Sequence, residues 1–133
     1  MRLIAFRPEY QITAEPSRNR IFYKHFAELA QAQDLPDYLH DWQQALDAVR
    51  PGFTILSDMT ELVEISESLA KLIEQAQLLL HGRGLRMIAT VHALGAGPVP
   101  NGPGEESTPE RPRQHFTDLW EADRFLDELV AEA

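Results

Sequence analysis

Polar and apolar residues alternate near the start of the chain, which is the pattern of half-buried β-strands. Residues 9–15 read Glu-Tyr-Gln-Ile-Thr-Ala-Glu, and residues 20–27 are rich in aromatic and β-branched types. Pro16 and the turn-forming triplet Ser17-Arg18-Asn19 separate the two segments. The pattern predicts an antiparallel hairpin.

Three later segments repeat apolar residues at the 3.6-residue period of a helix that buries one face. The first runs from Leu35 to Val49 and precedes a Pro-Gly pair, and the second runs from Ile65 to Leu80 and precedes two glycines. The third begins near residue 118 with the Asp-x-x-Glu spacing of a capping box. Each segment therefore predicts an amphipathic helix.

Short apolar runs at 53–59 and 85–92 lie between or beside these helices and predict buried strands, and residues 114–116 predict a brief edge strand. Strands that alternate with helices are typical of α/β domains. We therefore expect a single layer of mixed β-sheet with about four to five strands, packed by three main helices on one face or on both.

One segment, residues 95–113, shows neither the two-residue period of a strand nor the 3.6-residue period of a helix. It holds five of the nine prolines and four of the seven glycines, and it shows no apolar periodicity. Such a composition cannot bury enough surface to offset the entropy of ordering it, so we expect a mobile loop within one domain that spans residues 1–133. The loop is either a tolerated surface insertion or a flap or partner-contact segment.

Composition and charge narrow the class of protein. Hydrophobic residues make up 44% of the 133 residues, which is enough for a globular core, and the lack of Cys excludes disulfides and thiolate chemistry. Twelve basic against 21 acidic residues give a net charge of −9, which argues against duplex nucleic acid or an anionic membrane surface as the main partner. The chain starts without a signal-peptide core, and no apolar run reaches the roughly 20 residues of a membrane span, so we expect a cytoplasmic protein.

Three segments together resemble the STAS domain, the fold of bacterial anti-sigma-factor antagonists of the SpoIIAA-like family. Residues 53–60 (Phe-Thr-Ile-Leu-Ser-Asp-Met-Thr) are similar to the central strand, residues 66–91 to the next helix–strand unit, and residues 116–126 to the closing strand–helix unit. The resemblance covers roughly residues 9–130. It implies a non-catalytic regulatory module that binds a protein partner at the strand–helix junction, residues 58–68.

The resemblance places the partner-binding and regulatory residues of this chain at Asp58, Thr60, Ser66, Glu67 and Ser68. Family members carry a phosphorylated serine at the N-terminus of this helix, where unpaired N–H groups and the helix dipole stabilise a phosphate. An ungapped placement from Asp58 puts Glu67 at that position and Leu69 at the position of the usual glycine. Three interpretations stay open: Ser66 caps the helix while Glu67 complements its dipole, Ser66 or Ser68 is phosphorylated, or the surface is permanently charged.

A second implication of the resemblance is an apolar ligand. A wider STAS-like and lipid-transfer-like group shares this fold and is thought to bind such molecules. The alternative function is therefore a binder or carrier of a small apolar ligand, held in a groove between sheet and helices near residues 95–113. The groove residues would be Phe22, Tyr38, Trp42 and His92. Aromatic residues at these spacings are more often part of a hydrophobic core.

Histidines and carboxylates are the other candidates for chemistry. The five histidines lack the i, i+4 spacing of a metal-binding helix, although His25 and His92 would converge if their strands pair. Four carboxylates recur at steps of three from Asp58 to Glu67, which favours an acidic rim facing solvent or a basic partner over a cation site. The sequence contains no nucleophile elbow, P-loop or dinucleotide-binding glycine pattern, so we expect neither an enzyme nor a bound metal or cofactor.

Charge is distributed unevenly along the chain. Residues 1–26 carry five basic and two acidic groups, whereas residues 34–74 carry two basic and nine acidic groups. Such asymmetry would orient contacts with a partner, or between two copies in a head-to-tail homodimer.

Overall fold

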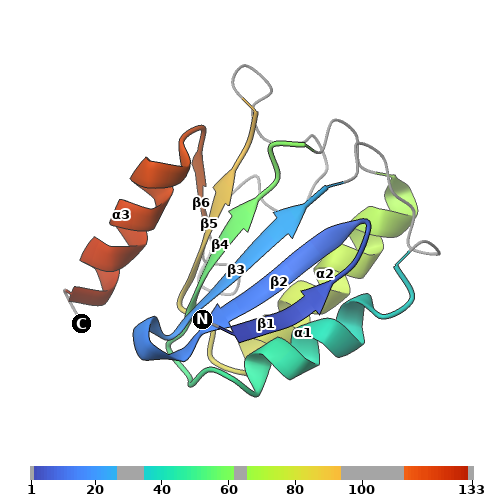
Figure 1. Cartoon of the computed structure of the whole chain (residues 1–133), viewed down its shortest axis with the longest axis horizontal. Helices are drawn as coiled ribbons and strands as arrows, with labels where there is room; N and C mark the ends of the chain where they lie inside the picture. The colour runs from blue at the N-terminus through green and yellow to red at the C-terminus, as the bar shows by residue number, and fades with distance from the viewer. Residues whose placement is uncertain (1, 27–34, 62–65, 94–112, 132–133) are drawn as a thin grey trace.

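The computed structural model describes residues 2–26, 35–61, 66–93 and 113–131, and this part of the chain folds as an α/β structure around one mixed sheet (Figure 1). Its strands are β1 (Arg2–Phe6), β2 (Tyr10–Glu15), β3 (Arg20–His25), β4 (Thr54–Asp58), β5 (Met87–Val91) and β6 (Arg113–Phe116). Its helices are α1 (Tyr38–Leu46), α2 (Glu67–Gly82) and α3 (Leu119–Ala131), with a 3-10 turn, η1, at Pro16–Arg18.

The six strands lie side by side in the order in which they occur along the chain. β1, β2 and β3 pair antiparallel, and β3 to β6 pair parallel. The β2–β3 hairpin turns through η1 and Asn19, whose φ of 53° is a left-handed conformation that asparagine tolerates. The parallel arrangement brings the carboxyl ends of β3, β4, β5 and β6 to one edge of the sheet.

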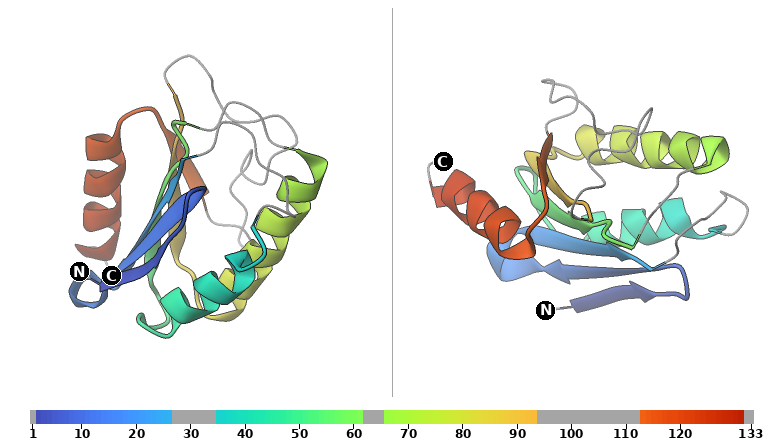
Figure 2. Two further views of the ribbon diagram at one scale, coloured as in Figure 1. Left: turned by 45° about the vertical axis from the view of Figure 1, so that its right-hand side comes forward. Right: turned by 90° about the horizontal axis from the view of Figure 1, so that it is seen from above.

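Helices cover the two faces of the sheet unequally (Figure 2). α1 and α2 pack on one face, called the inner face here, and α3 packs on the other, the outer face, over β4, β5 and β6. Alternation along β2 sends Tyr10, Ile12 and Ala14 into the interior, while Gln11 and Thr13 lie on the outer face. α3 reaches the outer side of β3 at Arg20, through Asp123 and Asp127, whereas no helix of the described part of the chain lies over the outer side of β1 and β2 (Figure 2).

The expectation of a mixed sheet packed by three helices is confirmed, and the sheet has one more strand than predicted. The additional strand is β1, which the alternation pattern missed. A register shift between Leu3 and Ala5 interrupts its pairing with β2, so the two-residue period is broken within five residues. In the predicted 95–113 loop, Arg113 belongs to β6, and the rest lies outside the described residues.

No helix within the described ranges is long and apolar enough to cross a membrane.

Candidate functional site

The candidate site begins where β4 ends, at Asp58. This residue is only 8% exposed, and its Oδ1 accepts hydrogen bonds from the backbone N–H of Thr60 at 3.1 Å and from the Thr60 hydroxyl at 2.7 Å. A carboxylate that binds the backbone two residues later stabilises a tight turn. Asp58 and Thr60 therefore shape the exit from the strand, and Asp58 has little exposed surface to offer a partner.

Lys24 supplies the counter-charge for this turn. It lies opposite Asp58 in the parallel β3–β4 pair, and its Nζ is 3.6 Å from Asp58 Oδ2 and 3.5 Å from Glu61 Oε2. The Glu61 side chain is 47% exposed. The ammonium group lies between the two carboxylates and partly neutralises the charge of Asp58. The Glu61 carboxylate extends into solvent.

The N-terminus of α2 forms the second half of the junction. The Oγ of Ser66 accepts a hydrogen bond from Leu69 N–H at 3.1 Å, so Ser66 is the N-cap of the helix. Glu67 follows with a side chain that is 89% exposed, and its carboxylate is 3.7 Å from Lys71 Nζ. This geometry agrees with the interpretation in which Ser66 caps the helix and Glu67 faces solvent at its positive end. Phosphorylation of Ser66 or Ser68 stays a prediction.

Two of the predicted groove residues lie on the buried face of α1, in the core. Tyr38 is 3% exposed and Trp42 is 4% exposed, and both pack on the ring of Tyr23 with centroid distances of 6.0 Å and 5.4 Å. Tyr10 completes this aromatic cluster, 5.4 Å from Tyr38. Rings packed this closely contribute mainly to stability through buried area and edge-to-face contacts.

The third groove residue, His92, is paired with another histidine. Its Nε2 is 2.8 Å from Nδ1 of His115 on the neighbouring strand β6. Burial lowers the pKa of His92, and the charge of a protonated His115 would lower it further. Nothing local in the sequence pairs these residues, because they are 23 positions apart and meet only through the β5–β6 register.

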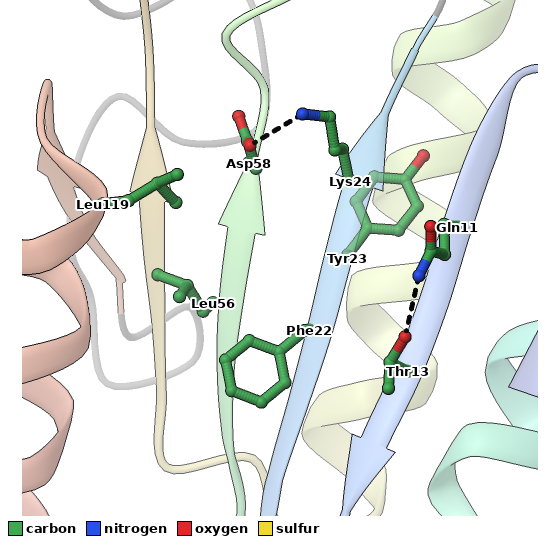
Figure 3. A pocket seen from close by; sticks show the side chains of 8 residues that line it. All are labelled: Gln11, Thr13, Phe22, Tyr23, Lys24, Leu56, Asp58 and Leu119. Carbon is green, nitrogen blue, oxygen red and sulfur yellow. Dashed lines mark hydrogen bonds and ion pairs between the residues drawn. The ribbon is translucent and has the colours of Figure 1, made fainter. Parts of the chain in front are cut away.

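The fourth groove residue, Phe22, lies on the outer face of the sheet. It lines a hollow of about 180 Å³ together with residues of β2, β3, β4 and the start of α3 (Figure 3). The lining is Gln11, Thr13, Phe22, Tyr23, Lys24, Leu56, Asp58 and Leu119. Phe22 thus lies on the opposite face of the sheet from Tyr38 and Trp42. Binding of an apolar ligand stays a prediction.

His25 is a buried titratable group at the carboxyl end of β3. It is 1% exposed; its Nδ1 is 2.8 Å from the Tyr23 hydroxyl, and its buried Nε2 has no hydrogen-bond partner among the described residues. Burial lowers its pKa to about 4, against the opposing effect of the Glu61 charge. His25 does not meet His92, since β4 lies between their strands. Among the described residues, no three His, Asp or Glu side chains are grouped as metal ligands would be.

The basic residues of the N-terminal hairpin are paired within the chain. Arg7 donates to Asp41 at 2.6 Å and 2.9 Å, and Lys24 lies between its two carboxylates as described above. Arg18 and Arg20 contact Asp123 and Asp127 of α3 at 2.8 to 2.9 Å. Four of the five basic residues of residues 1–26 are thus neutralised by contacts inside one copy, and a head-to-tail homodimer stays a prediction.

Sequence reasoning missed a set of apolar side chains that point into solvent on and beside the outer face. Leu3 is 58% exposed, Phe6 is 69%, Leu119 is 42% and Trp120 is 81%. The capping-box pattern at residue 118 predicted the start of α3, and the same helical period places Trp120 opposite the apolar stripe at residues 122, 125, 126 and 129, a signal that could have indicated its exposure.

A scan of protein-family models, a search of curated proteins and a search of solved structures found no match for this chain. The resemblance to STAS domains is thus an expectation from the sequence that the comparisons leave untested.

Proposed function

We infer that this chain is a non-catalytic, STAS-like regulatory module that binds a protein partner through the β4–α2 junction, residues 58–68. The observation that carries this proposal is the position of Glu67, whose side chain is 89% exposed at a helix end that Ser66 already caps. Since the cap hydrogen bond comes from Ser66, the Glu67 carboxylate is available to a cation on a partner.

Buried and exposed residues have different roles in this junction. Asp58 and Thr60 hold the turn after β4, while Glu61 and Glu67 present negative charge to solvent. The ion pair of Glu67 with Lys71 spans 3.7 Å between side chains that are 89% and 71% exposed. Such exposed pairs contribute little to stability, so a partner can replace Lys71 at low cost. The partner that fits this surface carries Arg or Lys at its contact point.

Affinity purification from the native host tests this proposal. The tagged wild-type chain is compared with Glu67→Lys and with a matched control, Glu128→Lys, which reverses an exposed charge on α3. We expect at least one protein to co-purify with the wild type and the control and to be lost with Glu67→Lys. Circular dichroism melts verify that both variants stay folded.

A neutral variant, Glu67→Gln, separates lost attraction from introduced repulsion and should give an intermediate recovery. The proposal is overturned if every protein that co-purifies with the wild type is recovered equally with folded Glu67→Lys. Denatured mass measurement of the same samples detects a phosphate on Ser66 or Ser68, which would establish the phosphorylated interpretation.

A further inference from the structure

The inner face of the sheet changes from apolar to polar along the parallel strands. Ile55 of β4 lies opposite Ile88 of β5, and both side chains are buried in the core that α1 and α2 cover. Two residues further along each strand, the same face carries Ser57 on β4 and Thr90 on β5, with His115 of β6 in register beside them. Ser57, Thr90 and His115 are called the polar row here.

The polar row is partly open to solvent, although it lies at the centre of the sheet on a face that helices cover. Its three side chains are half-buried, whereas Ile55 is 1% exposed and Ile88 is 8% exposed. α2 diverges from the sheet toward its N-terminal end, on the side where the parallel strands end (Figure 2). The helix thus covers the isoleucines more closely than the polar row.

The two hydroxyls of the polar row are available to a ligand. Ser57 and Thr90 lie opposite each other in the β4–β5 pair, and no side chain of the described residues forms a hydrogen bond with either hydroxyl. Polar groups on a covered face cost stability unless water or a ligand satisfies them. Residues that break the apolar pattern of a core in this way are expected at functional sites.

Each member of the polar row is the penultimate residue of its strand. The row therefore follows the carboxyl ends of β4, β5 and β6. Open α/β sheets bind their ligands in this region, outside the carboxyl ends of parallel strands.

The charge on this face of the three strands is positive. Arg113 lies two residues before His115 on the same side of β6, is 4% exposed, and donates to the neutral amide of Gln77 on α2 at 3.0 Å. Among the described residues of β4, β5 and β6, none that faces this side is acidic, since Asp58 lines the hollow on the outer face. Glu74, three residues before Gln77 on α2, is exposed to solvent. A negatively charged ligand is therefore the class that this face favours.

We propose that the polar row binds a small oxyanion, a carboxylate or a phosphate group, whose oxygen atoms accept hydrogen bonds from the hydroxyls of Ser57 and Thr90. Arg113 supplies positive potential from the neighbouring position of β6. The pair formed by His115 and His92, with 2.8 Å between Nδ1 and Nε2, borders the bound group at the carboxyl end.

The pKa of His92 gives this proposal a second readout. Burial and the charge of a protonated His115 lower this pKa, and a bound negative charge opposes both effects. Arg113 of β6 and Glu74 of α2 keep their charges between pH 6 and 8. Oxyanion binding should therefore raise the pKa of His92, and by reciprocity the anion should bind more tightly at pH 6 than at pH 8.

Nuclear magnetic resonance of the histidine rings in the full, ¹⁵N-labelled chain tests the proposal. Sodium phosphate and sodium acetate are titrated separately near pH 6.5, with sodium chloride keeping the ionic strength constant. We expect the ring signals of His92 and His115 to shift and to saturate with at least one anion, while His81, exposed on α2, stays unchanged. The anion that saturates at the lower concentration identifies the group that the row prefers.

Two matched variants assign the binding to the row. Thr90→Val removes one hydroxyl while keeping the shape of the side chain, and it should weaken binding about 10-fold or more, as expected for a hydrogen bond to a charged group. Thr13→Val makes the same change on the outer face and should bind as the wild type does. Circular dichroism melts verify that both variants are folded.

The proposal is overturned if neither anion gives a saturable shift of the His92 and His115 rings up to about 50 mM, or if folded Thr90→Val binds as tightly as Thr13→Val. The titration uses the chain without a partner protein. Its failure would therefore leave the partner site at Glu67 untouched, and the failure of that site would leave the oxyanion titration unchanged.

Discussion

Removal of the two aspartates that face Arg20 gives the sharpest test of how α3 is held against the sheet. The Arg20 side chain is 1% exposed, its Nε donates to Thr54 Oγ1 at 3.1 Å, and its other contacts are Asp123 at 2.8 Å and Asp127 at 2.9 Å. Arg18 shares the same two carboxylates from a more exposed position. Replacing Asp123 and Asp127 together by alanine leaves a buried guanidinium without a counter-charge.

The expected loss follows from burial. An ion pair whose buried partner loses its counter-charge costs about 3–5 kcal/mol, a large share of the roughly 5–15 kcal/mol that stabilises a domain. For 133 residues this lowers the melting temperature by about 10–18 °C. Asp127→Ala alone should cost no more than about 1 kcal/mol, because the Asp127 side chain is 54% exposed and Asp123 remains.

Urea unfolding followed by far-ultraviolet circular dichroism measures these free energies. The decisive comparison repeats the double alanine change in an Arg20→Met background, where no buried charge is left unpaired. There the two alanine changes should cost less than about 1 kcal/mol, since the stranded guanidinium is gone. The reasoning is refuted if the double variant loses less than about 1 kcal/mol with Arg20 present, or loses equally in both backgrounds.

Two further predictions concern pH and backbone geometry. Since burial lowers the pKa of His25 to about 4 while the unfolded side chain titrates near 6.5, stability present at pH 7 is lost as pH falls from about 6.5 to 4, by up to about 3 kcal/mol. The urea midpoint of His25→Phe should depend less on pH across that range than the wild-type midpoint does. An equally steep pH dependence would contradict this assignment. Gly84→Ala should destabilise by about 1–3 kcal/mol, because φ is +94° and an added Cβ would meet Pro51 Cβ at 2.8 Å. Gly82→Ala, with nothing within 4 Å, should be neutral or slightly stabilising in the same melts, and equal losses for the two glycine variants would refute the backbone argument.

The fold was predictable where one strong period ran through a whole element. The hairpin of β2 and β3 and the apolar stripes of α1, α2 and α3 all appear where the patterns place them. The order of the elements along the chain did not determine which face of the sheet each helix covers. Crossovers of one hand between successive parallel strands place α1 and α2 on the same face of the sheet. The handedness rule could therefore have predicted that these two helices lie together. α3 follows the last strand without a crossover, and its face is set by side chains that only the structure brings together.

The candidate site was predictable in its local parts and not in its long-range ones. Ser66 as a cap and Glu67 as an exposed acid follow from neighbouring residues in the sequence. The separation of Phe22 from the inner-face aromatic residues could also have been predicted, because strand alternation sends residues 22 and 23 to opposite faces of the sheet. The pairing of His92 with His115 required the register of β5 and β6, which no local pattern determines.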